Sequence, residues 1–268
     1  MIGLCTDSNS QLPLVLAQRY GVEVVPMTLV VDDREYLEGH DLDIDIFYSM
    51  FTDSHQPTVT FSEPSPGQFA LAYDELIDRG CSQILSIHTS ASVSGTLKAA
   101  RLAAHSAPVP VRLIDSGTAR FGVSCCVWAA AEALARGASV DDAAIVAETL
   151  APRLGNTFIV SGLDLVRGTG EARQRSVLSL DDETVVVLAR VDSIVDAVNE
   201  MARRTLVQGD GLRVAIGTAH RDVQPISDAL ADAIGEAANV VEVVHFRIGP
   251  SVGAETGPGT VGCVVFPS

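Results

Sequence analysis

Short runs of strand-forming residues alternate with amphipathic helical windows along most of this sequence, and this alternation constrains the fold more than any other feature. Residues 2–5, 83–88 and 111–114 have the composition of strands, and each precedes a helical window. Strands that are joined through a helix run parallel, because a hairpin turn is too short for that connection. We therefore predict an α/β fold built on a mainly parallel sheet with helices on both faces.

Local start and stop signals indicate where several helices begin and end. Gly21 follows the first helical window, and glycine commonly ends a helix because it tolerates positive φ. Ser65 followed by Pro66 is typical of an N-cap with proline in the first turn. Ser139 with Asp142 three residues later is a variant of the capping box. These signals predict helices that start near residues 65 and 139.

The rest of the chain extends the pattern and suggests two domains. Residues 22–31 are predicted to form one strand, whereas residues 32–58 are polar and acidic, with helical periodicity only at 44–51. Further strands are expected at 157–161, 184–190, 213–218, 240–246 and 261–266, and helices at 194–206 and 223–237. The 268 residues suffice for two ordinary domains. We predict an N-terminal α/β domain over 1–153 and a smaller mixed-sheet α/β domain over 154–268.

Charge and hydropathy exclude several classes of function. The chain carries 18 basic and 34 acidic side chains, a formal net charge of −16. Such an acidic protein is not expected to bind nucleic acid or anionic lipid surfaces. The mean hydropathy is positive, at +0.27, yet no apolar run reaches the ~18 residues that a membrane helix needs. The apolar residues are therefore expected in a folded interior, and the protein is not expected to span a membrane.

Cysteine and histidine usage argues against a metal or redox site. The five cysteines form no CxxC pair, and the six histidines show no metal-ligand spacing. The first residues also lack the basic and apolar regions of a signal peptide. We expect reduced thiols in a cytoplasmic protein, with no metal and no cofactor.

A hydroxyl-rich turn after the strand at 83–88 is the most informative candidate site. Ser94, Gly95 and Thr96 lie where this turn enters the next helix. Unpaired N–H groups and the positive end of the helix dipole favour anions there. The alternative interpretation is that Ser94 is only an N-cap. Both interpretations stay open on spacing alone.

Two other turns are weaker candidates. One is the proline-stiffened segment 58–67, and the other is 255–259, whose glycines permit close backbone approach. Neither can be distinguished from a structural turn by its composition. GxGxxG after the first strand, GxxxxGK[ST] and GxSxG are all absent, so nucleotide binding by these loops and serine hydrolysis are poorly supported.

Taken together, these turns resemble the DegV family of bacterial fatty-acid-binding proteins. The similar segments, in order, are Thr6-Asp7-Ser8 with Leu12-Pro13 (TDS…LP), Val24-Val25-Pro26-Met27 (VVPL), Phe61-Ser62-Glu63-Pro64-Ser65-Pro66-Gly67 (TSQPSPG), Ser94-Gly95-Thr96 (SGT), Ile114-Asp115-Ser116 (IDS) and Gly257-Pro258-Gly259 (GPG). Each motif alone is weak, but six in the same order over nearly the whole length are specific.

The resemblance implies two α/β domains with a long-chain fatty acid between them. The acyl chain would lie in an apolar pocket of the second domain, and Ser94 with the N–H of Gly95 would hold the carboxylate. The TSQP threonine corresponds to Phe61 here, so Thr60 or Ser62 would assist instead. The resemblance also implies that the protein is not a catalyst, and that a separate kinase subunit with a dihydroxyacetone-kinase-like fold phosphorylates the carboxylate.

The sequence departs from the family pattern at two further positions. Glu171 stands where the family has the arginine of its GGR motif, with Arg173 two residues later. Glu255 replaces the histidine that usually precedes GPG by two residues. The two acidic replacements would oppose a bound carboxylate unless they face away, so Glu171 and Glu255, together with Arg173, are assigned a supporting or partner-facing role.

Three hypotheses follow. The first is a non-catalytic binder of a long-chain fatty acid or related amphiphile. The second is an enzyme that uses Ser94 as a nucleophile or anion anchor, although the spacing of His88 shows no triad. The third is a regulatory member that has lost the carboxylate site.

Overall fold

The computed structural model describes residues 1–52, 54–160, 175–181 and 184–268. Their contacts divide the chain into two compact units. One unit comprises Met1–Leu42 and Val59–Arg153, and the other comprises Asp43–Thr58 and Leu154–Ser268. The segment 43–58 thus belongs with the C-terminal part of the chain, which its place in the sequence does not suggest.

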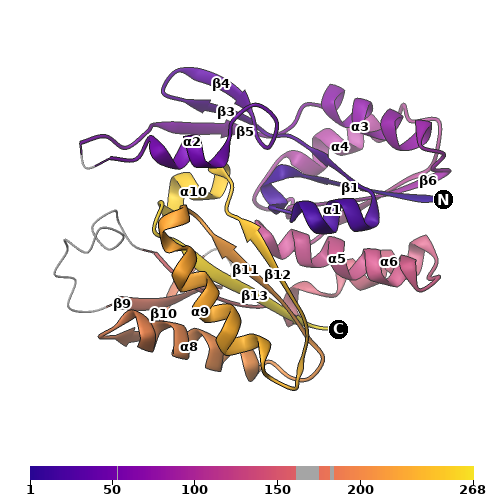
Figure 1. Ribbon diagram of the computed structural model, residues 1–268. Coiled ribbons are helices and arrows are strands. Elements are labelled where there is room, and N and C mark those ends of the chain that lie inside the picture. Colours follow the sequence, from indigo (N-terminus) through magenta and orange to yellow (C-terminus); the bar gives the residue numbers. More distant parts are fainter. Residues whose placement is uncertain (53, 161–174, 182–183) are drawn as a thin grey trace. The chain divides into compact units, whose positions relative to one another are not determined.

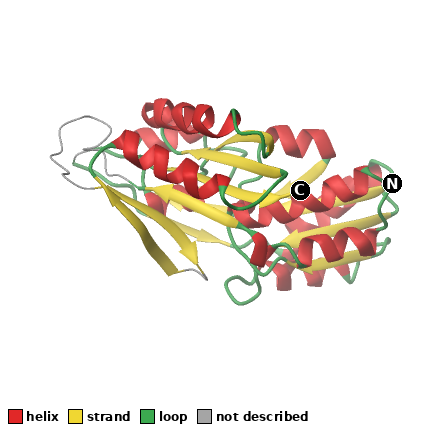
Figure 2. Ribbon diagram, turned by 90° about the horizontal axis from the view of Figure 1, so that it is seen from below, coloured by secondary structure: helices red, strands yellow, loops and turns green. Residues whose placement is uncertain are grey.

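The first unit contains the predicted parallel sheet. Its four strands lie in the order β2-β1-β6-β7, and all neighbours are parallel. The strands are β1 (Ile2–Asp7), β2 (Val22–Val25), β6 (Gln83–His88) and β7 (Val111–Asp115). The helices are α1 (Leu14–Tyr20), α3 (Pro66–Asp78), α4 (Thr96–Ala104), α5 (Phe121–Ala135) and α6 (Val140–Glu148). α3 and α4 cover one face of the sheet, and α5 and α6 cover the other (Figures 1 and 2).

The predicted helix starts are confirmed. Ser65 is the N-cap of α3, and a capping box links it to Gln68: Ser65 Oγ accepts from the Gln68 N–H, and the Ser65 N–H donates to Gln68 Oε1 at 2.8 Å. Ser139 caps α6 in the same way by accepting from the Asp142 N–H at 3.1 Å. Local sequence signals were sufficient here because each bond spans only three residues.

The prediction of a single strand over residues 22–31 is wrong. The chain breaks at Pro26, and Thr28–Val31 (β3) leaves the parallel sheet to join a separate antiparallel sheet of order β4-β3-β5. Proline has no N–H to continue a ladder, which explains the break. The other two strands are β4 (Arg34–Leu37) and β5 (Val59–Ser62), both within segments expected to lack strands.

The turn between β3 and β4 is formed by two aspartates in an uncommon conformation. Asp32 and Asp33 have φ values of 45° and 66°. Positive φ at both positions of a two-residue turn is the geometry that matches the twist of a hairpin. Asn-Gly or Asp-Gly is its usual signal, so the Asp-Asp pair did not reveal the hairpin.

The second unit is a six-stranded mixed sheet of order β10-β9-β8-β13-β11-β12. The strands are β8 (Gly155–Ile159), β9 (Arg175–Asp181), β10 (Thr184–Val191), β11 (Leu212–Thr218), β12 (Val240–Arg247) and β13 (Val261–Pro267). Its helices are α2 (Ile44–Ser49), α8 (Ile194–Leu206), α9 (Gln224–Gly235) and α10 (Pro250–Thr256). α8 and α9 pack together on the sheet over a continuous apolar core. The predicted fold class, a parallel α/β sheet and a mixed α/β sheet, is confirmed.

Two elements of this unit, β9 and α10, were not expected from the sequence. The α10 segment contains proline and glycine and resembles an irregular turn, yet it forms a helix that packs on α2. Tyr48 of α2 is 1% exposed, and its hydroxyl donates to the Ile248 carbonyl at 2.8 Å. This contact joins residues 200 positions apart, which explains why no local pattern predicted it.

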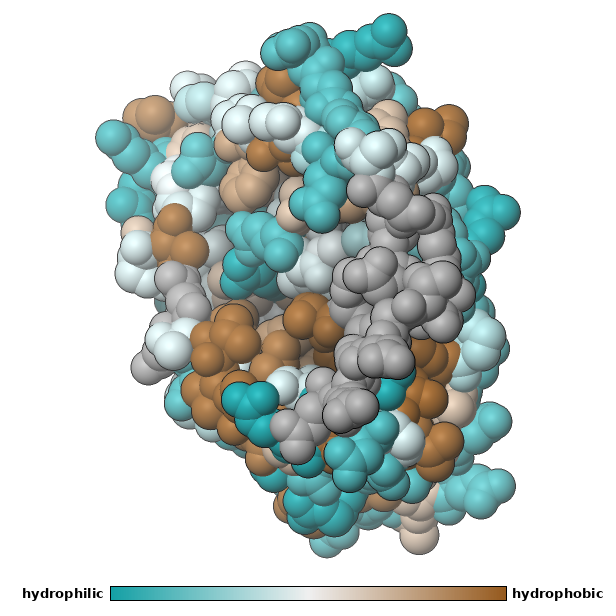
Figure 3. Space-filling model, turned by 90° about the vertical axis from the view of Figure 1, so that its left-hand side faces the viewer, coloured by the Kyte–Doolittle hydropathy of each residue, from teal (hydrophilic) through white to brown (hydrophobic). Residues whose placement is uncertain are grey.

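One edge of the mixed sheet carries exposed apolar side chains. Val185, Val186 and Val187 of the edge strand β10 are 56%, 37% and 48% exposed. Figure 3 views the side of the molecule on which β9 and β10 lie in Figure 1, and it shows hydrophobic side chains gathered there. Contiguous apolar surface of this kind is typical of a contact or ligand site.

Candidate functional site

The Ser94–Thr96 turn lies at the start of α4, as the sequence predicted. Gly95 is the N-cap residue and Thr96 the first residue of the helix. The Ser94 hydroxyl accepts from the Thr96 N–H at 3.2 Å and lies 2.8 Å from the Thr96 hydroxyl. Ser94 is half-buried, Gly95 is exposed, and Thr96 is 2% exposed. Ser94 and Gly95 are therefore the members of this turn that a ligand can reach.

A carboxylate of the protein itself occupies the donors of this turn. Glu63 Oε1 accepts from the Gly95 N–H at 3.0 Å and from the Ser94 hydroxyl at 3.4 Å. The Gly95 N–H is the main cause of a lowered pKa for the Glu63 carboxyl, with the Ser94 hydroxyl a smaller contribution in the same direction. Glu63 was not among the predicted site residues, although it stands in the 58–67 turn at the position of the family's glutamine.

The other predicted residues of that turn lie on β5 and do not contact Ser94. Phe61 pairs with Leu29 of β3 and is 45% exposed. Thr60 and Ser62 are both exposed, and they share the opposite face of the strand because side chains alternate along it. Within the described residues, the hydrogen bonds between the two turns come from Glu63 and not from Thr60 or Ser62.

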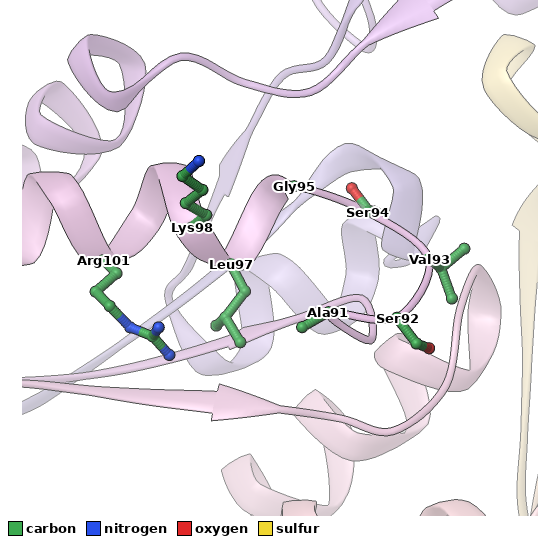
Figure 4. A pocket seen from close by; sticks show the side chains of 8 residues that line it. All are labelled: Ala91, Ser92, Val93, Ser94, Gly95, Leu97, Lys98 and Arg101. Atoms are coloured by element: carbon green, nitrogen blue, oxygen red, sulfur yellow. The ribbon is translucent and has the colours of Figure 1, made fainter.

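A hollow of about 330 Å³ lies beside the Ser94–Thr96 turn, at the lower end of the size range of ligand pockets. The residues that line it are Ala91, Ser92, Val93, Ser94, Gly95, Leu97, Lys98 and Arg101 (Figure 4). In Figure 4, Lys98 extends from one side of α4, whereas Leu97 and Arg101 extend from the other. The hollow thus combines hydroxyl groups with two cationic side chains.

A second polar group lies inside the first unit and links Asp7, His88 and Ser86. Asp7 Oδ2 is 2.8 Å from His88 Nδ1, and His88 Nε2 is 2.6 Å from the Ser86 hydroxyl. The Ser86 hydroxyl is also 3.0 Å from that of Tyr73. The sequence spacing did not reveal this Asp–His–Ser arrangement, because Asp7 belongs to β1 and His88 to the neighbouring strand β6.

The arrangement resembles a catalytic triad in connectivity but not in accessibility. Asp7, Ser86 and His88 are all 0% exposed, so a substrate cannot reach the serine. Asp7 Oδ1 has no hydrogen-bond partner among the described residues. The three side chains therefore act as a buried polar network of the core, and Ser94 does not belong to it.

The remaining predicted site residues fall elsewhere. Glu255 lies on α10 of the second unit and is exposed. Glu171 and Arg173 lie outside the described residues. In the part of the chain that the structure describes, no group of three or more metal-binding side chains occurs, and no helix is long and apolar enough to cross a bilayer. All five cysteines are buried and unpaired.

Comparisons with known proteins place the fold. A family model described as "Uncharacterised protein, DegV family" matches residues 1–171. A DegV domain-containing protein of Streptomyces coelicolor is 32% identical over 276 residues, which cover 98% of this chain and 98% of that protein. One from Mycobacterium tuberculosis is 28% identical and covers 97% of this chain and 95% of its own length.

Solved structures match equally completely. One described as "Fatty Acid Binding of a DegV family Protein from Thermus thermophilus" has a TM-score of 0.83 and 26% identity, and covers 100% of this chain and 99% of its own. The structure of DegV from Bacillus subtilis, described as a fatty acid binding protein, has a TM-score of 0.79 at 22% identity, with the same coverage. At that identity the second comparison supports the fold alone.

The fold is that of an α/β protein of two compact units. In the first unit, hydrogen-bond donors at the start of α4 bind a carboxylate oxygen. Within that class, the chain belongs to the DegV family, because the family model covers residues 1–171 and the Streptomyces relative matches almost end to end. The resemblance inferred from the six motifs is confirmed.

Proposed function

We propose that this chain is a non-catalytic, cytoplasmic carrier of a long-chain fatty acid or related amphiphile, with the head group at Ser94 and Gly95. One observation carries the proposal: these two residues already donate hydrogen bonds to a carboxylate oxygen, that of Glu63. The turn therefore has the donors and the geometry that a carboxylate head group needs. The fatty-acid binding of the Thermus thermophilus relative supports the same ligand class, and five unpaired cysteines are typical of a reducing compartment.

The acyl chain supplies most of the affinity in this proposal. About fifteen methylenes at about 0.8 kcal/mol each are worth at most about 12 kcal/mol, before the entropy lost on association. The family resemblance assigns the acyl chain to an apolar pocket of the domain over 154–268. The exposed valines of β10 offer apolar surface in that unit.

The most direct test is chemical analysis of the purified protein. We expect mass spectrometry of a lipid extract from the denatured protein to find a long-chain acyl species, and added palmitate or oleate to raise the melting temperature. Ser94→Ala should weaken palmitate binding about tenfold or more, because it removes a hydroxyl donor to a charged group. The absence of both an acyl species and a thermal shift would refute the proposal.

Ser92→Ala is the matched control for Ser94→Ala. Ser92 lines the same hollow, but its hydroxyl pairs with that of Ser90 and not with Glu63. We expect Ser92→Ala to bind palmitate as the unmodified chain does. Equal losses in the two variants would show that a general disturbance of the loop, and not the Ser94 hydroxyl, controls binding.

The second part of the proposal is presentation of a bound carboxylate to a separate fatty acid kinase subunit. It rests on the family resemblance, and Glu255 departs from that pattern by placing an exposed negative charge where the family has histidine. A pull-down with the cognate kinase subunit tests it. Binding by the unmodified chain supports this part, whereas binding only by a Glu255→His variant would show that the role has been lost.

A further inference from the structure

The carboxylate of Glu63 already binds the hydrogen-bond donors of the proposed head-group site. The residue directly follows β5 and precedes the buried Pro64, so its backbone is held beside the start of α4. Its carboxylate accepts the Gly95 N–H and the Ser94 hydroxyl, the same two donors that the proposed function assigns to the ligand. Ligand and side chain therefore compete for one pair of donors.

The charge of Glu63 decides the outcome of this competition. The Gly95 N–H lowers the pKa of the Glu63 carboxyl, so this side chain is ionised at neutral pH. An ionised fatty acid has no proton to donate to Glu63. It must either displace Glu63 or lie beside a second negative charge, and two unit charges about 4 Å apart repel measurably even in water.

The cationic side chains beside the hollow do not neutralise Glu63. Lys98 and Arg101 line the same hollow, but neither pairs with Glu63, and neither contributes to the lowered pKa of its carboxyl. In Figure 4 the Lys98 and Arg101 side chains leave α4 in different directions. The chain as a whole carries a net charge of −16, which opposes the approach of an anion.

A hydroxyl head group satisfies the same site without conflict. Its hydrogen can be donated to the Glu63 carboxylate, and its oxygen can accept from the Gly95 N–H or the Ser94 hydroxyl. Glu63 then exchanges one of its present donors for the ligand hydroxyl, so every polar group keeps a partner and Glu63 can stay ionised.

We propose that Glu63 determines the head-group specificity of this site and makes the chain prefer long-chain amphiphiles with an uncharged hydroxyl head group over ionised fatty acids. This inference rests on the proposed function, since it assumes that the hollow beside Ser94 receives the head group. It assigns Glu63 a direct role in selecting the ligand.

The test compares dodecan-1-ol with dodecanoate, which share a chain length and differ in head group. Dissociation constants for both are measured at pH 7.5 with the full chain, with Glu63→Gln and with Glu35→Gln. Glu63→Gln keeps the size and the accepting oxygen of the side chain but removes its charge. Glu35→Gln makes the same chemical change at an exposed position on β4.

We expect the unmodified chain to bind the alcohol more tightly than the carboxylate. Glu63→Gln should tighten dodecanoate binding by about tenfold or more, with a much smaller effect on the alcohol. Glu35→Gln should leave the ratio of the two constants unchanged. If Glu63→Gln shifts this ratio by less than twofold, or weakens dodecanoate binding, the assignment of Glu63 is wrong while the proposed function stands.

Failure of the proposed function has a different signature. In that case neither amphiphile binds to the unmodified chain or to Glu63→Gln, although circular dichroism shows that both are folded. That outcome overturns the site itself and, with it, the role of Glu63.

Discussion

Replacement of Gly253 by alanine tests how α10 is held on α2 in the second unit. A Cβ built on Gly253 would lie 2.9 Å from Tyr48 Cζ and 3.1 Å from Cε1, and closer still to the hydroxyl oxygen. Tyr48 is 1% exposed and its hydroxyl donates to the Ile248 carbonyl at 2.8 Å. The ring therefore cannot move aside without losing both its packing and this hydrogen bond.

The expected magnitude follows from three contributions. Alanine is favoured over glycine inside a helix by about 1 kcal/mol. Overpacking a filled site costs about 1–3 kcal/mol. A buried carbonyl left without its donor costs about 1–3 kcal/mol more. We therefore expect Gly253→Ala to lower the free energy of unfolding by about 1–5 kcal/mol.

The assay is urea unfolding followed by far-UV circular dichroism. The shift in the urea midpoint is converted into a change in the free energy of unfolding with one slope (m-value) for all variants. Gly235→Ala is the matched control in the same unit, because a Cβ at Gly235, the last residue of α9, meets nothing within 4 Å. That variant should be as stable as the parent or more stable, by up to about 1 kcal/mol.

A double-mutant cycle separates the clash from other effects. Tyr48→Phe removes the hydroxyl that the new methyl group meets most closely. Gly253→Ala should therefore cost less in the Tyr48→Phe background than in the unmodified chain. Equal costs in the two backgrounds, or a stabilising Gly253→Ala, would refute the reasoning.

Three further predictions concern charged and buried groups. The Arg247 guanidinium lowers the pKa of Asp45 below its ordinary value of 3.8. Asp45 therefore stabilises the native state at pH values above 3.8, and this stabilisation is lost as the pH falls through the lower pKa of the native state. Asp45→Asn should lower the urea midpoint at pH 7 and lose less stability than the parent between pH 5 and pH 2; parallel pH profiles would contradict this. His88→Ala removes the hydrogen-bond partner of the buried Asp7 side chain and leaves a cavity, so it should cost about 3 kcal/mol or more in urea unfolding; a loss under about 1 kcal/mol would show that the network contributes little. Burial raises the pKa of the Cys126 thiol to about 12, and all five cysteines are buried, so Ellman's reagent should label none in the native protein and five after denaturation. Rapid labelling of the native protein at any cysteine would disprove the last expectation.

The parts of the fold that were predicted correctly rest on short-range signals. Ser65 with Gln68 and Ser139 with Asp142 mark helix starts because the capping groups lie three residues apart. The hairpin at Asp32–Asp33 was missed because its positive φ values occur without glycine. α10 was missed because its stability depends on Tyr48, which belongs to a distant segment.

The same division applies to the candidate site. The Ser94–Thr96 turn was located from its sequence, since a strand, a hydroxyl-rich turn and a helix follow one another directly. Glu63 is separated from Gly95 by 32 residues, and only the packing of the loop after β5 beside α4 brings them together. Thr60 and Ser62, which were predicted to help bind the carboxylate, lie on β5. In the described part of the chain neither forms a hydrogen bond to this turn.

By itself the sequence determined the fold class, the family and the position of the Ser94–Thr96 turn, because each is encoded in local periodicity, in caps and in ordered short motifs. Only the tertiary structure decided that residues 43–58 belong to the second unit and that Asp7, His88 and Ser86 form one buried network. It also decided that the Glu63 carboxylate accepts from the Gly95 N–H at the start of α4. These contacts join distant segments, so they depend on how strands and helices pack and not on residue spacing.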